Sequence, residues 1–408
     1  MAQTQDLHAA DTAPTSVGNP KRICVLGSTG SIGVNTLDLL RFAAERGEQN
    51  VEVVALTANS NVALLAEQCR AFRPEFAAIA DAAKLEELRA ALDGLEIEIG
   101  GGPEAVVEAA NRDSDWVMSA IVGAAGLPGT LAAAERGAAV ALANKEALVC
   151  AGDVVKAAVA RSGGMLLPVD SEHNAIFQVY DFERPHRISK LILTASGGPF
   201  RTADIETMRR ATPAEAVKHP NWSMGAKISV DSASMMNKGL ELIEATHLFP
   251  TPEEQIEILV HPQSVIHSMV EYVDGSTLAQ LGSPDMRTPI ASCLAWPDRT
   301  PSPSPTLDLV EIGQLTFEAP DPVRFPAIRL AREAAKAGGT APGVLNAANE
   351  IAVEAFLKER VGFLDIAAIV EETLAATPAG ELTSLDDAMA ADAAARASAR
   401  SIVEKRAQ

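Results

Sequence analysis

The sequence predicts an α/β protein with a doubly wound parallel sheet, followed by an α+β region with a smaller sheet and then a C-terminal helical bundle. Apolar runs of strand length recur through residues 21–169 and alternate with Ala-rich stretches of helical spacing. This alternation is typical of a parallel sheet covered by helices. Beyond it the alternation is less regular, and the end of the chain is rich in Ala, Glu and Leu at helical spacing. A chain of 408 residues is long enough for two or three domains.

Short apolar runs mark the expected strands. In the first region they are 23–26, 51–56, 77–80, 116–122, 139–142 and 165–169, and in the second 191–194, 256–260 and 264–273. Helical spacing is clear at 36–42, 347–357 and 366–374. Four prolines between Trp296 and Pro305 exclude a helix or a central strand there. We therefore expect a tail at 1–20, domains at 21–169 and 170–295, a linker at 296–320 and a helical domain at 321–408.

The composition limits the classes of partner. The formal charge of −20 argues against nucleic acid or an anionic membrane, because both need an extended basic surface. No apolar run approaches the ~20 residues that span a bilayer, and the N-terminus lacks a secretory signal, so we expect a cytoplasmic protein. The cysteines Cys24, Cys69, Cys150 and Cys293 are scattered, with no metal-ligand spacing. We expect reduced core residues.

A glycine loop follows the first strand. Gly27, Gly30 and Gly33 stand three residues apart and open a helix, a context in which the backbone can approach a pyrophosphate at the helix N-terminus. The alternative is a strand-to-helix turn that binds nothing. An acid after the second strand would select NAD through the ribose 2′-hydroxyl. Residues 57–61 contain no acid, which favours NADPH, although they also contain no Lys or Arg.

Carboxylates predict a metal site. Asp170 and Glu172 end an apolar strand two residues apart, so in an extended chain both leave on the same side. Glu241 is a suitable third ligand, and Asn237 and Lys238 share its helix face. Three carboxylates suit Mg²⁺ or Mn²⁺. The alternatives are that Asp170 caps the next helix and that Glu241 is a surface residue.

Hydroxyl, amide and ammonium groups near these carboxylates predict a phosphate site. Ser196 begins a Ser-Gly-Gly turn after a strand, and Ser232 precedes Lys238; charge-assisted bonds from such groups suit a phosphate. Trp222 lies in a polar segment bounded by Pro and Gly and could close over a substrate, or it could anchor the loop on the core. Lys145 follows a strand and could meet a substrate oxygen, or it could only begin a helix. A metal site, a phosphate site and a dinucleotide loop together indicate a metal-assisted reductase of a small phosphorylated substrate.

Seven motifs carry a resemblance to a known family. They are GSTGSIG, ALANKEALV, VDSEHNAIFQ, ASGGPFR, HPNWSMG, MMNKGLELIEA and HPQSVIHSMVE. In this order they closely resemble the 1-deoxy-D-xylulose 5-phosphate reductoisomerase family, from about Lys21 to the C-terminal helices. The resemblance implies a V-shaped homodimer with a Rossmann-like NADPH domain at 21–169, a catalytic, connective and dimerisation domain at 170–295 with a lid at 216–227, and the C-terminal helical domain.

The resemblance also implies the site residues. The expected ligands of Mg²⁺, Mn²⁺ or Co²⁺ are Asp170, Glu172 and Glu241. The expected substrate contacts are Lys145, Ser171, Glu172, Ser196, His219, Trp222, Ser232, Asn237, Lys238 and Glu241, with Met224 also in the lid. The expected NADPH contacts are Thr29, Gly30, Ser31, Ile32, Asn59, Ser60, Asn61, Asn144, Glu146 and Gly225. Many family members have Gly-Lys-Asn in place of Asn59-Ser60-Asn61, so this chain departs from the family there.

The reaction implied by the resemblance is the rearrangement of 1-deoxy-D-xylulose 5-phosphate, by retroaldol cleavage and re-aldolisation, and reduction by NADPH to 2-C-methyl-D-erythritol 4-phosphate. It is the committed step of non-mevalonate isoprenoid synthesis. The sequence leaves two other interpretations of the function open. One is another NADPH dehydrogenase, such as a homoserine or semialdehyde dehydrogenase, which needs no carboxylate triad. The other is a non-catalytic NADPH-binding regulator.

Overall fold

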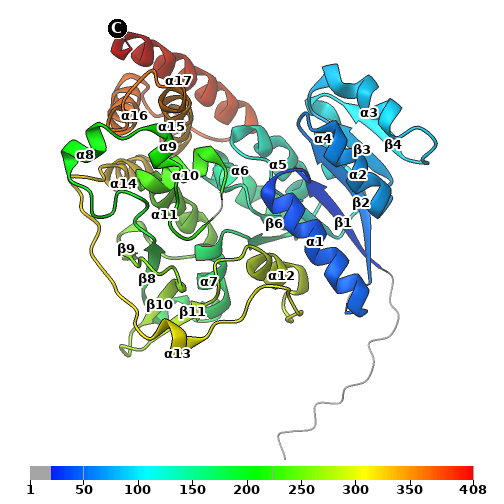
Figure 1. Cartoon of the computed structure of the whole chain (residues 1–408), viewed down its shortest axis with the longest axis horizontal. Coiled ribbons are helices and arrows are strands. Elements are labelled where there is room, and N and C mark those ends of the chain that lie inside the picture. The colour runs from blue at the N-terminus through cyan, green and yellow to red at the C-terminus, as the bar shows by residue number, and fades with distance from the viewer. Residues whose placement is uncertain (1–19, 49, 223, 408) are drawn as a thin grey trace, which may run out of the picture.

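The computed structural model describes residues 20–48, 50–222 and 224–407. The tail expected at 1–20 lies outside these residues except for Pro20. Figure 1 shows the described chain, with the first sheet and its helices on one side and the C-terminal helices on the other.

The first sheet is parallel and has seven strands in the order β4-β3-β2-β1-β5-β6-β7. The strands are β1 (Lys21–Leu26), β2 (Val51–Ala58), β3 (Phe76–Ile79), β4 (Glu98–Gly101), β5 (Trp116–Ser119), β6 (Ala139–Leu142) and β7 (Met165–Pro168). The strand order reverses between β1 and β5, so the predicted doubly wound sheet is confirmed. The edge strand β4 was missed, because two of its four residues are glycines and only Ile99 is a large apolar residue.

Helices cover both faces of this sheet. They are α1 (Ser31–Arg46), α2 (Val62–Phe72), α3 (Leu85–Ala91), α4 (Pro103–Asn111), α5 (Leu127–Glu135), α6 (Lys145–Ser162) and, from later in the chain, α12 (Arg287–Ala295). Along β1, Ile23 packs with α1, α2 and α12, whereas the next residue, Cys24, packs with α4, α5 and α6. Strand side chains alternate between faces, so the consecutive apolar residues 23–26 of β1 require helices on both sides of the sheet.

The second sheet has four strands in the order β11-β10-β8-β9. They are β8 (Ile188–Ala195), β9 (Ile256–Val260), β10 (Ile266–Tyr272) and β11 (Thr277–Leu281), and β8 is parallel to β9 but antiparallel to β10. Helix α7 (Ser171–Val179) packs on β10 and β11, and α11 (Met236–Leu248) contacts β8 and β9. Three of these strands were predicted. The edge strand β11 was missed, because its side chains are mostly exposed and carry little apolar signal.

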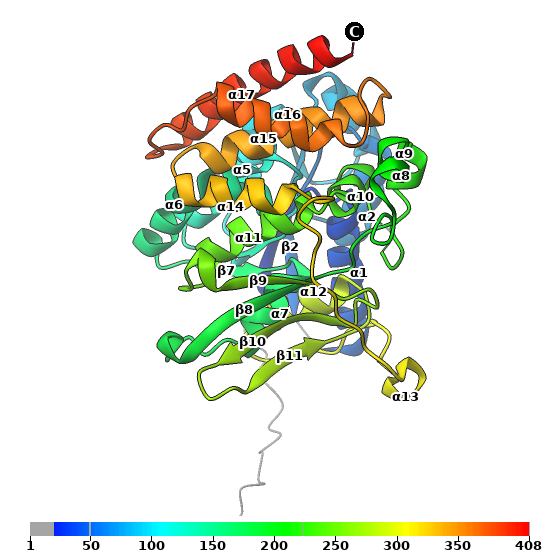
Figure 2. The same cartoon turned by 90° about the vertical axis from the view of Figure 1, so that its left-hand side faces the viewer.

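The helices that follow form the predicted bundle. Residues 296–305 contain neither helix nor strand, as their prolines predict, and the next helix is the single turn α13 (Leu309–Ile312). The bundle consists of α14 (Ala327–Ala337), α15 (Ala341–Leu357), α16 (Asp365–Ala376) and α17 (Leu385–Arg406). Figure 2 shows α15 between α14 and the outer helices α16 and α17. Helix α15 also contacts α6 of the first domain and α10 (Ala226–Ala233), so it joins the bundle to the rest of the fold.

Within the described ranges, no helix combines the length and the apolar character that a membrane crossing requires.

The glycine loop and α1 pack with no spare volume at Gly33. A Cβ atom there would lie 2.4 Å from the Gly27 carbonyl oxygen and 2.5 Å from the Ser28 Cα atom. Both atoms belong to the backbone of the loop, which Thr57 of β2 fixes by accepting the Gly27 N–H at 2.9 Å. A larger residue at Gly33 must therefore push α1 away from the loop.

We predict that Gly33→Ala lowers the free energy of unfolding by about 1–3 kcal/mol, the usual cost of inserting a methyl group into a packed site. Gly343→Ala is the matched control, because the nearest atom to its Cβ would be 3.6 Å away and Gly343 lies within α15. Denaturant unfolding of the two variants checks this. Equal free energies of unfolding for both variants and the wild type would contradict this prediction, because they would show that the glycine loop shifts without cost to accommodate the methyl group.

A buried histidine, His267, makes the stability of the fold depend on pH. His267 of β10 is 5% exposed and packs against Trp222 at 6.1 Å between ring centroids. Burial lowers the pKa of His267 to about 4, below its ordinary value of 6.5. The unfolded state therefore binds more protons than the folded state between these values, and stability is lost as the pH falls through this window.

We expect the free energy of unfolding to fall between about pH 6.5 and pH 4, with up to about 3 kcal/mol of the change due to His267. His267→Gln should flatten this part of the stability profile, whereas substitution of the exposed His186 by Gln serves as the control. Urea unfolding at several pH values measures the slope. An unchanged slope in His267→Gln would contradict the assignment.

Candidate active site

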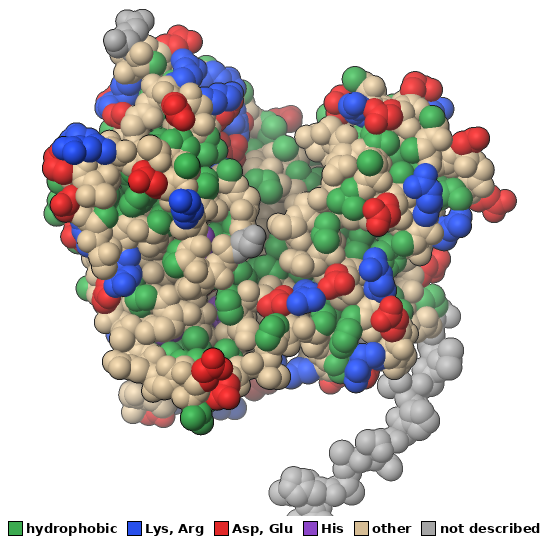
Figure 3. Space-filling model, viewed as in Figure 1, with side chains coloured by type: hydrophobic (Ala, Val, Ile, Leu, Met, Phe, Trp, Pro, Cys, Tyr) green, Lys and Arg blue, Asp and Glu red, His purple; other side chains and the backbone are tan. Residues whose placement is uncertain are grey.

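A cavity of about 390 Å³ lies between the two sheets. Its lining residues include Ser31 after β1, Lys145 after β6, Asp170 after β7 and Ser196 after β8. Figure 3 shows the hollow between the lobe of the first sheet and the lobe that carries the C-terminal helices. Because carboxyl ends of parallel strands meet at one edge of a sheet, residues far apart in the sequence converge here.

The three carboxylates predicted as metal ligands come together. One oxygen from each of Asp170, Glu172 and Glu241 lies within 4.8 Å of the others. Asp170 precedes α7 and its Oδ1 accepts the Glu172 N–H at 3.1 Å, so it caps the helix and also lines the cavity. Glu241 lies in α11 and is fully buried, which excludes the surface interpretation. A set of close, hard oxygen donors suits Mg²⁺ or Mn²⁺.

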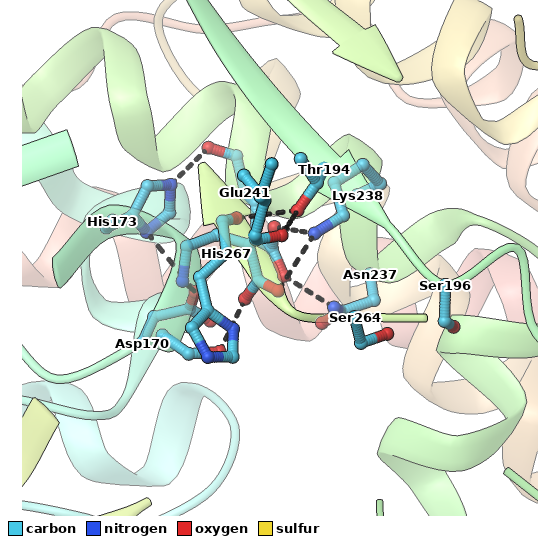
Figure 4. A network of polar contacts seen from close by, with 12 residues as sticks. Asp170, His173, Thr194, Ser196, Asn237, Lys238, Glu241, Ser264 and His267 are labelled. Atoms are coloured by element: carbon cyan, nitrogen blue, oxygen red, sulfur yellow. Dashed lines mark hydrogen bonds and ion pairs between the residues drawn. The ribbon is translucent and has the colours of Figure 1, made fainter. Parts of the chain in front are cut away.

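Two lysines face these carboxylates. The Lys145 ammonium lies 2.8 Å from Asp170 Oδ2 and 3.3 Å from Glu241 Oε1, and it donates to Asn237 Oδ1 at 2.6 Å. Lys238 donates to Glu241 Oε2, and its Nζ lies 3.8 Å from Glu172 Oε1. Figure 4 shows Lys238 and Asn237 directed at Glu241. Lys145 does begin a helix, α6, but its side chain belongs to this ion-pair cluster.

Burial and the neighbouring charges shift the pKa values of Asp170 and Glu172 in opposite directions. Burial alone would raise the pKa of Asp170, but the charges of Lys145, His173 and Lys238 hold it well below its ordinary value. Burial raises the pKa of Glu172, and the neighbouring Glu241 and Asp170 raise it further against the opposing Lys238. Asp170 is therefore an anion near neutral pH, whereas a cation that binds Glu172 must displace its proton.

A buried pair of one histidine and one glutamate, His173 and Glu244, lies next to the carboxylates. His173 Nε2 lies 2.9 Å from the Glu241 carbonyl oxygen, and His173 Nδ1 lies 3.0 Å from Glu244 Oε2. Burial would lower the pKa of His173, but Glu244 raises it to about 9. Figure 4 shows His173 in the same network of polar contacts as Asp170 and Glu241. This pair was not predicted from the sequence, because only tertiary packing brings His173 of α7 to Glu244 of α11.

The residues expected to bind phosphate line the same cavity. Gly198 adopts a φ of +64°, and a Cβ atom there would lie 2.9 Å from the Ser232 carbonyl oxygen. The glycine therefore allows the turn after β8 to approach α10, which carries Ser232. Ser196, Ser232, Asn237 and Lys238 all line the cavity. The Ser-Gly-Gly segment is irregular chain between β8 and a turn that begins at Pro199, and it brings Ser196 to the site.

The described part of the expected lid is fixed by His219. Its Nδ1 accepts the backbone N–H groups of Asn221 at 3.2 Å and Trp222 at 2.9 Å. With Nδ1 an acceptor, the proton of the neutral ring is on Nε2, which donates to Ser196 Oγ at 2.8 Å. Burial lowers the pKa of His219 to about 4, and the Lys238 charge acts in the same direction. Trp222, Met224 and Gly225 line the cavity, so Trp222 does more than anchor its loop.

The residues expected to bind NADPH divide into two groups. Ser31, Ile32, Asn144, Glu146 and Gly225 line the cavity. Thr29, Gly30, Asn59, Ser60 and Asn61 are not among its lining residues. Asn61 instead caps α2, its Oδ1 accepting the Leu64 N–H at 3.2 Å, and Asn59 and Ser60 are exposed. They lie at the carboxyl end of β2, next to β1 in the sheet.

Several lining residues were not predicted as site residues. They are mainly apolar or small residues of the loop after β5 and of α10, together with Asn35, Lys227, Asp231, Met235 and Ser264. Lys227 Nζ lies 3.0 Å from Glu146 Oε1 and 2.9 Å from Asp231 Oδ2. The signal for Lys227 and Asp231 is their four-residue spacing directly after the HPNWSMG motif.

Three family models match the chain. The model described as 1-deoxy-D-xylulose 5-phosphate reductoisomerase matches residues 23–152, and the model of that enzyme's C-terminal domain matches residues 166–249. A further model, described as the DXP reductoisomerase C-terminal domain, matches residues 281–398.

Curated relatives and solved structures agree with these models. The 1-deoxy-D-xylulose 5-phosphate reductoisomerase of Rhodospirillum centenum is 63% identical over 383 residues, which cover 94% of each chain. That of Caulobacter vibrioides is 58% identical over 396 residues, covering 96% of this chain and 98% of the relative. The enzyme from Zymomonas mobilis, solved in complex with NADPH, has a TM-score of 0.89 and 53% identity and covers 95% of this chain and 100% of its own. A DOX-P reductoisomerase solved with NADPH, fosmidomycin and magnesium has a TM-score of 0.88 and 45% identity, and the match covers 94% of this chain and 98% of that one. The chain therefore belongs to the 1-deoxy-D-xylulose 5-phosphate reductoisomerase family, a family of oxidoreductases.

Proposed function

We propose that this protein converts 1-deoxy-D-xylulose 5-phosphate into 2-C-methyl-D-erythritol 4-phosphate, with NADPH and a divalent metal ion, in non-mevalonate isoprenoid synthesis. The proposal rests on one observation: three sets of residues lie together at one cavity. They are the carboxylates Asp170, Glu172 and Glu241, the hydroxyl and ammonium groups around Ser196, and the N-terminal residues of α1. They match the needs of a metal, a phosphate and a dinucleotide.

The residues present fit a divalent cation. Their carboxylate oxygens are close and hard. Lys145 pairs with Asp170 and Lys238 pairs with Glu241, through contacts that a cation could replace. A bound metal would polarise the ketone and its neighbouring hydroxyl as a Lewis acid. Mg²⁺, Mn²⁺ and Co²⁺ all remain candidates. Family relatives solved with magnesium support this part of the proposal.

The chain's own residues would position the substrate. We assign the phosphate to Ser196, Ser232, Asn237 and Lys238, with His219 beside them, and the oxygenated carbons to Lys145 and Ser171. The neutral His219 ring holds Ser196 and the lid backbone at once, so it would link phosphate binding to the position of Trp222. Trp222 and Met224 would then exclude water from the reacting atoms.

NADPH would enter from the side of the first sheet. The N-terminus of α1 at Ser31 offers free backbone N–H groups to a pyrophosphate, and Asn144, Glu146 and Gly225 line the cavity beyond it. We assign Thr29 and Gly30 to the pyrophosphate end and Asn59, Ser60 and Asn61 to the adenosine end, outside the cavity. A relative solved with NADPH supports the choice of cofactor.

The wider features implied by the resemblance stay predictions. They are the homodimer, the cytoplasmic location, the domain boundaries at 21–169, 170–295 and 321–408, and the lid at 216–227. Sedimentation of the purified protein tests the homodimer directly.

We predict that Glu241→Gln lowers turnover by about 1,000-fold or more. Removal of one carboxylate charge weakens metal binding, and metal-ion stabilisation of a transition state amounts to several kcal/mol, at about 1.4 kcal/mol per tenfold in rate. The dissociation constant for NADPH should change by less than about threefold, because that affinity does not depend on the carboxylate triad. Steady-state turnover and NADPH titration check both parts.

Glu86→Gln is the matched control, since its side chain is 85% exposed on a helix of the first domain. Near-normal turnover of Glu241→Gln would show that the metal site is wrong. Loss of NADPH binding together with turnover would instead indicate a general structural defect.

A further inference from the structure

Lys227 is a charged lining residue to which neither the resemblance nor the proposed reaction gives a role. It is the second residue of α10, and its side chain is only 24% exposed. Its ammonium lies between two carboxylates, 3.0 Å from Glu146 Oε1 and 2.9 Å from Asp231 Oδ2. Glu146 and Asp231 are nearly completely buried, with 7% and 2% of their side chains exposed.

The two carboxylates belong to different parts of the molecule. Glu146 lies in the first turn of α6, next to Lys145. Asp231 lies in α10, next to Ser232, and its Oδ1 accepts a hydrogen bond from Asn349 Nδ2 of α15 at 2.8 Å. Lys227 therefore connects the first sheet's domain to α10, while Asn349 connects α10 to the C-terminal bundle. All three side chains of the ion-pair group, Glu146, Lys227 and Asp231, line the cavity.

The Lys227 charge compensates the buried negative charges of Glu146 and Asp231. Burial would lower the pKa of Lys227, but Asp231, Glu146 and the more distant Glu350 raise it above its ordinary value. Burial would likewise raise the pKa of Glu146, and Lys227 instead holds it below the ordinary value. Without Lys227, two buried carboxylates would face one another without a cation between them, an arrangement that buried charges do not tolerate. Glu146 would then protonate or turn towards solvent.

We propose that Lys227 is a positioning residue that fixes the Glu146 carboxylate at the cofactor side of the cavity. The inference rests on the proposed function, in which Glu146 contacts NADPH. Lys227 acts on cofactor affinity through Glu146, and its charge, rather than its bulk, is what the site requires.

The test compares Lys227→Met, Lys227→Arg and the control Lys190→Met. Lys190 also lies between two carboxylates, 2.7 Å from Glu257 Oε2 and 3.4 Å from Glu271 Oε2, with 33% of its side chain exposed, but it lies on β8 outside the cavity lining. The dissociation constant for NADPH is measured by titration calorimetry without substrate, and kcat and KM are measured separately.

We expect Lys227→Met to weaken NADPH binding about tenfold or more, the loss that corresponds to one charge-assisted hydrogen bond. The KM for NADPH should rise in parallel, while kcat at saturating NADPH should fall less than about threefold. Lys227→Arg should restore binding to within about threefold of the wild type, and Lys190→Met should bind as the wild type does. An NADPH dissociation constant for Lys227→Met within about twofold of the wild type would overturn the proposal.

The double variant Glu146→Gln with Lys227→Met decides whether the lysine acts through Glu146. The double variant removes the carboxylate that Lys227→Met alone would leave unpaired. If Lys227→Met does not fold, the double variant therefore takes its place in the comparison. We expect it to bind NADPH as Glu146→Gln alone does. A further tenfold loss in the double variant would overturn the proposal. A wild-type protein that neither binds NADPH nor turns over substrate would instead contradict the proposed function itself.

Discussion

The arrangement of the site depends on the neutralisation of buried charge. Asp170, Glu172 and Glu241 lie against Lys145 and Lys238 with little access to water, and a buried charge is tolerated only beside a partner. The partners come from the ends of β6 and β7 and from α11, so satisfying the charges fixes these three segments relative to one another. The cluster holds three carboxyl groups and two lysines, and the proton that burial favours on Glu172 makes up the difference in charge. A divalent cation would take the place of this proton beside the three carboxylates.

The topology explains why the other groups meet this cluster. The order of the first sheet reverses between β1 and β5, which opens a crevice at the carboxyl ends of the strands. The turn after β8 reaches the same crevice from the second sheet, because Gly198 permits close approach to α10. Helix α15 holds α10 through Asn349. The cavity is thus built by three parts of the chain, and contacts at its edges, such as those of Lys227, transmit the position of one part to another.

Much of the fold and the site was predictable from the sequence, for a physical reason. Stretches of strand that are buried on both faces are apolar, so residues 23–26 of β1 and 191–193 of β8 were visible in the sequence. The edge strands β4 and β11 are not enriched in buried residues and were missed. Asp170 and Glu172 could be paired because they are two residues apart, but the extended chain predicted there was wrong, since Asp170 caps α7 and Glu172 lies within it. Glu241 was chosen as the third ligand because it shares a helix face with Asn237 and Lys238, and the structure confirms these contacts. The pairing of Lys227 with Glu146 could not be predicted, since the two residues are 81 positions apart and only tertiary packing joins them. His173 and Glu244 were overlooked because burial, which makes their pairing necessary, is not written in local spacing.

The most direct test of the account is the decay of NADPH absorbance with 1-deoxy-D-xylulose 5-phosphate, run once with Mg²⁺ and once with excess chelator. The account predicts oxidation of NADPH that requires both the substrate and the metal, because the carboxylate cluster and the cofactor side of the cavity serve one reaction. Oxidation that persists in chelator would contradict the role of the carboxylates. No oxidation under either condition, from folded protein, would contradict the proposed reaction and favour a regulator that binds NADPH without turnover.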